Sequence, residues 1–167
     1  MKTSQRKETG ASVPSGKGTK VEKTITVMAP ASQVYAFWRK LENLPRFMNH
    51  LESVVETDAT HSHWVVKGPA GKSVQWDAEI LEDRPNEMLS WRSLPGSEVD
   101  NAGSVWFTAM PNNTGTIVKV ALKYSPPAGM LGIAIAKLWG EDAETGIEED
   151  LQRLKRLLEG QPRAVAA

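Results

Sequence analysis

Two histidines in an H-x-H pattern are the residues of this sequence most typical of a metal-ligand pair. His61 and His63 lie in a segment that alternates like a β-strand, so their side chains share one face and stand about 7 Å apart along it. That spacing suits one metal ion, but the sequence offers no third ligand. Trp64 has the opposite parity and is expected to face the core, so the histidines are expected to face solvent. The sequence therefore predicts no metal site.

Asp77 and Glu79 form a second chemically suggestive pair, because glycosidases and many proton-transfer enzymes use two acidic groups. Both residues fall on the polar parity of their expected strand. Cross-strand partners such as Lys119 or Lys123 explain the two acids equally well as ordinary surface charges.

Arg92 and Arg46 are the best remaining candidates for catalysis, since a buried guanidinium polarises a carbonyl or holds a carboxylate. Arg92 alternates outward from Trp91, whereas Arg46 follows directly after Pro45, at the start of the second of two expected helical segments. The sequence shows no Ser/His/Asp order, no lysine with an activating neighbour and no nucleotide fingerprint. It predicts no catalytic residue and no cofactor.

An acidic cluster near the C-terminus lacks the glycine and the Asp/Asn spacing of a calcium loop. We expect it to be the solvated start of a helix. Its members are Glu141, Asp142, Glu144, Glu148, Glu149 and Asp150.

Composition restricts the class of protein. The chain has 167 residues, equal numbers of basic and acidic side chains, six Trp and no Cys, which excludes disulfide scaffolds, thiolate metal sites and thiol nucleophiles. Its longest apolar-rich segment, Met130–Trp139, is about half of what a bilayer requires, so we expect no transmembrane helix and a cytoplasmic location.

The N-terminal residues carry a basic surplus but almost no apolar side chains. Their charge density is low, so we expect a solvated tail and no nucleic-acid partner. The expected organisation is a disordered basic tail over 1–19, one ligand-binding domain over 20–160 and a frayed end over 161–167.

Hydrophobic periodicity predicts a strand, a helix, a short helix, a six-stranded meander and a C-terminal helix. A strand at Val21–Met28 precedes a helix at Gln33–Leu41 with Ser32 as its cap, and one more helical turn at Arg46–His50 follows. The meander strands are expected at Leu51–Thr57, His61–Lys67, Ser73–Leu81, Met88–Ser93, Gly103–Met110 and Thr116–Tyr124. The last helix carries a stripe of Ile147, Leu151, Leu154 and Leu158. Gly140 and Gly146 leave open whether 130–160 forms one bent helix or two.

Strand alternation places nearly all apolar side chains on one face of this sheet, and a single long helix is its only obvious cover. Three Trp rings on that face are either core or the flat walls of a pocket. In the pocket interpretation, the cavity is lined by Trp64, Trp76, Trp91, Ser93, Phe107, Val118, Val120 and Tyr124, with Leu131, Ile135 and Leu138 at its mouth or along the helix. Thr116 is a further polar group on this face.

The chain resembles the SRPBCC superfamily, which includes START domains, polyketide cyclase/dehydrase proteins and plant pathogenesis-related allergens. The resemblance lies in 21–30 (VEKTITVMAP), 44–48 (LPRFM), 76–80 (WDAEI), 91–93 (WRS), 103–107 (GSVWF) and 149–151 (EDL). It implies an α+β helix-grip fold in which a curved antiparallel sheet of six to seven strands wraps a long C-terminal helix. It also implies a hydrophobic cavity that binds lipids, quinones or polyketide-like compounds.

The first functional hypothesis is the carriage of a small hydrophobic molecule without catalysis. The second is a cyclase/dehydratase-type enzyme, which requires an ionisable group with a perturbed pKa inside the same cavity. The third is a membrane-peripheral or protein-interaction module that uses Met130–Trp139 as an exposed apolar patch. The identity of the ligand and the oligomeric state do not follow from the sequence.

Overall fold

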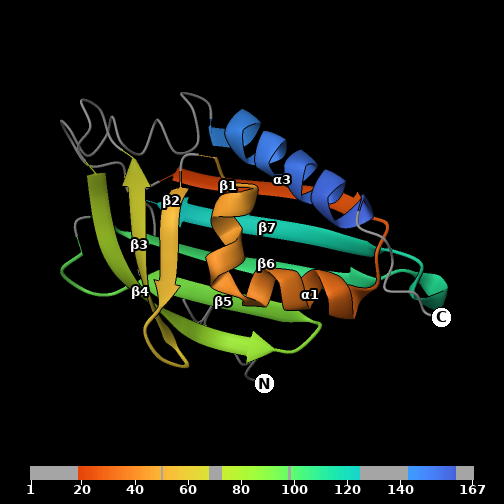
Figure 1. The fold of residues 1–167 in the computed structure, drawn as a ribbon, viewed down its shortest axis with the longest axis horizontal. Helices are drawn as coiled ribbons and strands as arrows, with labels where there is room; N and C mark the ends of the chain where they lie inside the picture. The colour runs from red at the N-terminus through yellow and green to blue at the C-terminus, as the bar shows by residue number, and fades with distance from the viewer. Residues whose placement is uncertain (1–18, 50, 68–72, 98, 125–142, 161–167) are drawn as a thin grey trace, which may run out of the picture.

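The computed structural model describes residues 19–49, 51–67, 73–97, 99–124 and 143–160 (Figure 1). The segment Met130–Trp139 and the side chains of Leu131, Ile135 and Leu138 lie outside the described residues, as do most of the two predicted terminal segments. The elements are β1 (Thr19–Val27), α1 (Ala31–Arg39), the 3-10 helix η1 (Leu41–Arg46), β2 (Leu51–Glu56), β3 (His61–Lys67), β4 (Ser73–Arg84), β5 (Met88–Ser93), β6 (Asn101–Ala109), the 3-10 turn η3 (Pro111–Asn113), β7 (Thr116–Tyr124) and α3 (Ala143–Glu159).

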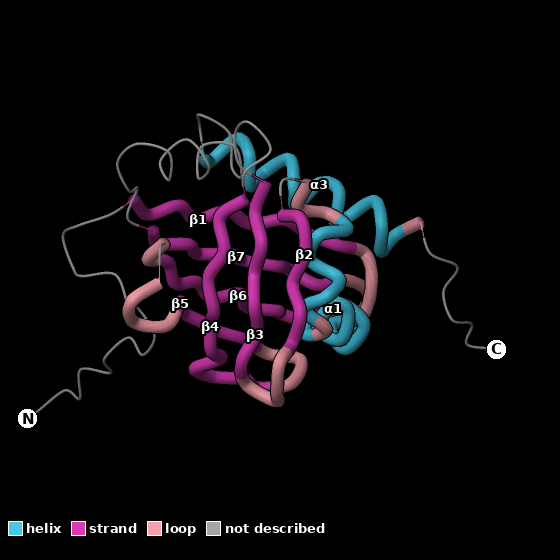
Figure 2. The backbone as a smooth tube through the Cα atoms, turned by 60° about the vertical axis from the view of Figure 1, so that its left-hand side comes forward, coloured by secondary structure: helices cyan, strands magenta, loops and turns pink. Residues whose placement is uncertain are grey.

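The strands form one seven-stranded antiparallel sheet in the order β1-β7-β6-β5-β4-β3-β2. From β2 to β7 each strand pairs with the next along the chain, because the connections are too short for crossover helices. β1 pairs with β7 and forms one edge of the sheet, and β2 forms the other edge. In Figure 1, β2 and β3 cross the direction of β6, β7 and β1, and Figure 2 shows the sheet curling around α1 and α3. The predicted α+β helix-grip architecture is confirmed.

The helix after β1 begins and ends earlier than predicted. Pro30 is the N-cap of α1, and Ser32 is exposed within the first turn and does not cap it. The backbone N–H of Ala31 instead donates to Oδ1 of Asn113, 3.3 Å away. Asn113 lies in η3 with φ of 53°, a left-handed conformation that asparagine tolerates better than most residues. The cap is therefore supplied by a residue distant in sequence, which local reading does not detect.

The short helix is also earlier in the chain than predicted. Residues Leu41–Arg46 form η1, so the predicted turn at Arg46–His50 is helical only at Arg46, and residues 47–49 are not helical. Pro45 lies within this helix. The short 3-10 form tolerates it because few of its backbone N–H groups have an intrahelical acceptor to lose.

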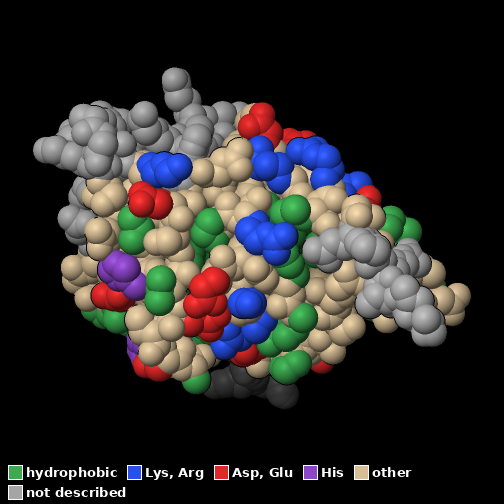
Figure 3. Space-filling view, in the orientation of Figure 1, with side chains coloured by type: hydrophobic (Ala, Val, Ile, Leu, Met, Phe, Trp, Pro, Cys, Tyr) green, Lys and Arg blue, Asp and Glu red, His purple; other side chains and the backbone are tan. Residues whose placement is uncertain are grey.

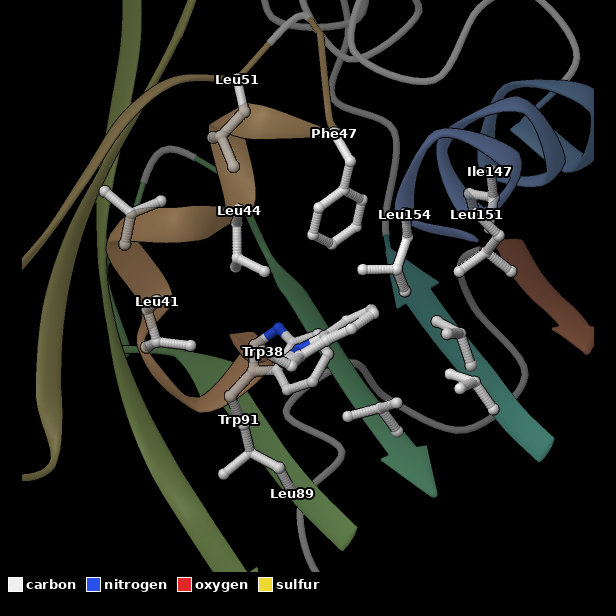
Figure 4. Close-up of a cluster of buried hydrophobic side chains, with 14 of the residues drawn as sticks. Trp38, Leu41, Leu44, Phe47, Leu51, Leu89, Trp91, Ile147, Leu151 and Leu154 are labelled. Atoms are coloured by element: carbon white, nitrogen blue, oxygen red, sulfur yellow. The ribbon is translucent and has the colours of Figure 1, made fainter. Parts of the chain in front are cut away.

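Three helical segments cover the inner face of the sheet, so the expectation of a single covering helix is wrong. α3 lies over β1, α1 contacts β6, and η1 packs against β2. The close-up in Figure 4 shows Leu151 and Leu154 of α3 extending toward Trp38 of α1 and Phe47. The predicted stripe of α3 is buried throughout, with Ile147, Leu151, Leu154 and Leu158 at most 4% exposed.

Trp91 and Gly103 form a cross-strand pair in which the missing side chain of one makes room for the ring of the other. They are directly opposite each other on β5 and β6. A Cβ atom on Gly103 would lie only 2.5 Å from Cζ2 of Trp91 and 2.7 Å from Cδ2 of Leu122. The indole therefore rests against the backbone of β6, which keeps a bulky ring within a thin layer of the interior.

Gly103→Ala is expected to lower the free energy of unfolding by about 1–3 kcal/mol, because the indole and its neighbours must shift to admit a methyl group. Urea denaturation measures the change, and near-UV circular dichroism reports the tryptophan environment. Ser104→Ala, at the next residue on the other face, is the control and is expected to change stability by no more than about 0.5 kcal/mol. Equal stability of the two variants contradicts the packing argument.

Arg39 joins the end of α1 to two strands of the sheet and to the turn between β2 and β3. Its guanidinium donates to Asp83 Oδ2 at 2.8 Å, to Glu56 Oε1 at 3.0 Å and to the carbonyl oxygen of Ala59 at 3.0 Å. Asp83 also accepts a hydrogen bond from the hydroxyl of Tyr35, and burial together with that bond raises the pKa of Tyr35 to about 12. This network fixes α1 over the inner face from its perimeter.

Arg39→Lys is expected to destabilise the protein by about 1–2 kcal/mol, because an ammonium group cannot reproduce the planar fork that serves three acceptors. Arg84→Lys is the matched control, since the one ion pair that Arg84 makes within the described residues is with Glu82 at the surface. Its effect is expected to stay within about 0.5 kcal/mol. Thermal unfolding compares both variants at low and high salt, and a similar loss in both rejects a specific role for Arg39.

Candidate functional site

Trp64 and Trp76 form an aromatic wall at the β3–β4 side of the inner face. They are cross-strand partners, and their rings stack with centroids 5.9 Å apart and planes 19° from parallel. Nε1 of Trp64 donates to Oγ of Ser62 at 2.9 Å. Nε1 of Trp76 is buried and has no partner among the described residues. The wall is thus apolar over its surface and carries one unused hydrogen-bond donor.

A second aromatic cluster lies beneath α1. The ring of Trp38 is 5.3 Å from that of Phe47 and 6.3 Å from that of Phe107, and Tyr35 meets Phe107 edge-on at 5.8 Å. Phe107, which the sequence assigns to the cavity lining, therefore packs against α1 in the structure. Nε1 of Trp38 is a further buried donor without a partner in the described part of the chain.

The other predicted lining residues of the sheet occupy the same inner face. Trp91, Ser93, Val118 and Val120 are all buried. Oγ of Ser93 accepts a hydrogen bond from the backbone N–H of Asn101 at 3.0 Å. The backbone of Tyr124 ends β7, and its side chain lies outside the described residues, as do those of Leu131, Ile135 and Leu138.

The expected polar role of Thr116 on this face is taken up by the fold. Its hydroxyl is fully buried and donates to the carbonyl oxygen of Ala29 at 2.7 Å. This bond links β7 to the turn between β1 and α1, so the hydroxyl supports the position of α1.

Asp150 is a site residue that the sequence analysis missed. The prediction that the whole acidic cluster is solvated is wrong for this residue, because Asp150 is only 4% exposed on α3. Arg153 donates from Nη2 to Asp150 Oδ1 and from Nε to the carbonyl oxygen of Phe47, at 2.8 Å in the latter case. Oδ2 of Asp150 is buried without a partner among the described residues. The signal was available in the spacing, since Asp150 lies three residues after Ile147 and four before Leu154.

The environment of Asp150 favours its protonated form. Burial raises the pKa of its carboxyl group most strongly, the charge and hydrogen bond of Arg153 oppose this effect, and the nearby Glu149 adds to it, so that the pKa is raised to about 7. Asp150 therefore changes charge near neutral pH inside an otherwise apolar layer.

A folded-state pKa above the unfolded value means that the folded protein binds the Asp150 proton more tightly. This tighter proton binding stabilises the folded protein fully below about pH 4, and the stabilisation is lost as the pH rises to about 7. Between these values Asp150 is expected to lower the free energy of unfolding by up to about 1.4 kcal/mol per pH unit. Asp150→Asn is expected to lack this component when the unfolding free energy is measured by urea denaturation across the pH range.

Glu148→Gln is the matched control, because it removes an exposed carboxylate from the same helix that is not among the groups acting on the Asp150 carboxyl. Its stability profile is expected to run parallel to that of the wild type. A parallel profile for Asp150→Asn as well contradicts the burial argument.

The outer face of the sheet holds the histidines and the other predicted candidates. Nδ1 of His63 lies 2.9 Å from Oδ1 of Asp77, and Nε2 lies 2.9 Å from Oε1 of Gln75. These two hydrogen bonds raise the pKa of His63. No group of three potential metal-ligating His, Asp or Glu side chains occurs within the described residues.

The expected lysine partners of the paired acids are wrong. Asp77 pairs with His63, and Glu79 accepts from Nε of Arg92 at 2.7 Å. β4 has β3 and β5 as its neighbours, so Lys119 and Lys123 on β7 are out of reach. Lys119 instead pairs with Glu22 on β1. Figure 3 shows basic and acidic side chains interspersed over one face of the molecule.

Arg46, the other arginine candidate, is exposed on η1, with its guanidinium 5.2 Å from the ring centroid of Phe37. The helices of the described ranges include none that has both the length and the apolar character needed to cross a bilayer.

Comparisons with known proteins agree with this architecture. The family model for polyketide cyclase/dehydrase and lipid transport matches residues 27–151. An uncharacterized 17.2 kDa protein of Streptomyces lincolnensis is 30% identical over 141 residues, which cover 84% of this chain and 90% of the relative.

Two solved structures share the fold. A Deinococcus radiodurans protein is 38% identical with a TM-score of 0.68, over 84% of this chain and 97% of its own. The Zhui aromatase/cyclase of a Streptomyces species is 21% identical with a TM-score of 0.61, over 89% of this chain and 98% of its own, a likeness that concerns the fold alone. The chain belongs to the polyketide cyclase/dehydrase and lipid transport family, in agreement with its resemblance to the SRPBCC superfamily.

Proposed function

We propose that the protein binds a small hydrophobic molecule, of the lipid, quinone or polyketide class, against the inner face of its sheet. The observation that carries this proposal is a set of buried polar atoms without partners in the described residues, within a largely apolar interior. They include Nε1 of Trp38, Nε1 of Trp76 and Oδ2 of Asp150.

Each such atom lowers stability, because a buried donor or acceptor that makes no hydrogen bond costs about 1–3 kcal/mol. A bound molecule that pairs with any of them recovers part of this cost. Flat aromatic walls with a few polar groups are the usual composition of a small-molecule site. The family to which the chain belongs and the aromatase/cyclase of similar fold also support the binding of a small hydrophobic molecule.

Binding of N-phenyl-1-naphthylamine, an apolar fluorescent probe, tests the proposal together with native mass spectrometry of gently purified protein. The probe is expected to gain fluorescence and to quench tryptophan emission. Trp64→Ala removes part of the aromatic wall and is expected to weaken binding of the probe about tenfold. Trp76→Phe keeps the apolar wall and removes only the N–H donor, so it separates the contribution of the donor from that of the wall.

Trp106→Phe is the matched control. Trp106 lies on the outer face of β6, where Lys119 Nζ is 5.6 Å from its ring centroid, so the substitution is expected to leave binding unchanged. Absence of both a co-purified molecule and probe binding refutes the proposal. Equal weakening by Trp64→Ala and Trp106→Phe places the probe elsewhere.

Asp150 also favours a second candidate function, a cyclase/dehydratase activity in the same interior. Such an enzyme needs an ionisable group poised near the working pH, and burial gives Asp150 a pKa of about 7. Heptane-2,4,6-trione serves as a model compound, because its intramolecular aldol condensation forms a dihydroxytoluene with loss of one water. Acceleration by the wild type but not by Asp150→Asn supports catalysis, and identical rates with and without protein reject it for this substrate.

A further inference from the structure

Two methionine side chains lie against one glycine, where the turn after β1 meets the connection between β6 and β7. A Cβ atom on Gly115 would lie 3.0 Å from Sδ of Met28 and 3.0 Å from Sδ of Met110. Both sulfur atoms therefore border the space that a side chain at position 115 would need, and they lie close to each other. Met28 and Met110 thus form a methionine pair over Gly115.

The methionines of the described residues differ in their access to solvent. Met28 is 43% exposed, Met48 and Met110 are partly buried, and Met88 is only 4% exposed. A thioether sulfur reacts with two-electron oxidants, and the sequence contains no Cys whose thiol would compete for them. Within the described ranges, Met28 is therefore the sulfur-containing side chain most open to an oxidant.

The methionine pair lies where the backbone supports two covering helices. The backbone N–H of Met28 donates to Glu159 Oε2 of α3 at 2.7 Å. The backbone N–H of Met110 donates to the carbonyl oxygen of Gly115 at 2.8 Å, and its carbonyl oxygen accepts from the N–H of Asn113 at 2.9 Å. The side chain of Asn113 accepts from the first backbone N–H of α1. Figure 1 shows the end of β1, the start of α1 and the C-terminal end of α3 at the same end of the sheet.

We infer that the methionine pair is a modification site, at which hydrogen peroxide or an organic peroxide oxidises Met28 to methionine sulfoxide. The sulfur gives up two electrons and forms a bond to one peroxide oxygen. The O–O bond breaks, and the other oxygen leaves as water or as the corresponding alcohol. Met110 lies deeper at the same glycine and is oxidised after Met28.

The sulfoxide does not suit the place that the thioether occupies. It is polar, whereas the thioether makes an apolar contact with Met110 over the glycine. The carbonyl oxygen of Val27 lies 3.2 Å from the position of a Cβ atom on Gly115. A carbonyl and a sulfoxide oxygen are both acceptors, so they make no hydrogen bond to each other. The oxidised side chain of Met28 therefore turns toward water, which opens the contact over Gly115 and weakens the turn that caps α1.

Peptide mapping by mass spectrometry, after treatment with increasing concentrations of hydrogen peroxide, tests the site on the wild-type protein. Oxidation of Met28 is expected to be about tenfold faster than that of Met88, because oxidation follows exposure. Met48 and Met110 are expected to react at intermediate rates. Oxidation of Met28 that is no faster than that of Met88 overturns the inference.

Thermal unfolding of the oxidised protein tests the effect on α1. The Tm of the wild type with Met28 oxidised is expected to fall by about 2–4 °C. Met28→Leu keeps an apolar side chain of similar volume without sulfur, so its Tm is expected to be unchanged by the same treatment. Met48→Leu is the matched control and is expected to lose stability as the wild type does. An equal fall in Met28→Leu, or no fall in the wild type, overturns the link between the methionine pair and α1.

Discussion

The inner face of a curled seven-stranded sheet must be removed from water, and the rest of the structure follows from how that is done. A flat sheet can be covered by parallel helices, but a curled one encloses a volume that needs filling from more than one direction. α1, η1 and α3 approach it from different sides and contact β6, β2 and β1 respectively. Aromatic side chains fill much of what remains, with Trp38, Phe47 and Phe107 at one side and Trp64 with Trp76 at the other.

Polar interactions at the perimeter keep the covering helices in place. Arg39 ties α1 to Asp83 and Glu56 of the sheet. At the far end of α3, Lys155 donates to the carbonyl oxygen of Thr26 and Glu159 accepts from the backbone N–H of Met28. These contacts are at the surface and leave the interior apolar. Asp150 is therefore an exception among the mostly apolar side chains between the helices and the sheet.

Strand positions that follow from the alternation of apolar and polar residues could be predicted from the sequence. Contacts between residues that are distant in the sequence could not. The bounds of β3, β5 and β7 are those predicted, because turn residues flank each strand and a period of two runs through β3 and most of β7. The cap of α1 was missed because Asn113 lies 82 residues further along the chain than Ala31. The lysine partners were wrong because strand order, which alternation does not reveal, places β7 away from β4.

The candidate site was predictable to the same limited degree. Alternation correctly placed Trp64, Trp76 and Trp91 on the buried face, but it could not show which rings contact one another. Asp150 was read as one member of an acidic run, although its helical spacing relative to Ile147 and Leu154 places it on the buried stripe. The helical position of Asp150 relative to its apolar neighbours decides its burial, and the number of acidic residues around it in the sequence does not.

Asp150 is costly for the fold, and that cost bears on its role. A leucine at the same position of the stripe would pack without a desolvated charge, and buried ion pairs often contribute less to stability than apolar residues of similar volume. Arg153 recovers part of the penalty but leaves Oδ2 open. The donors of Trp38 and Trp76 are open in the same layer. A plain hydrocarbon chain cannot pair with any of these atoms, whereas a polyketide-like compound with both hydroxyl and carbonyl groups can pair with the acceptor and with a donor. Among the proposed ligand classes, the polar atoms of the interior therefore favour oxygenated rings over simple lipid chains.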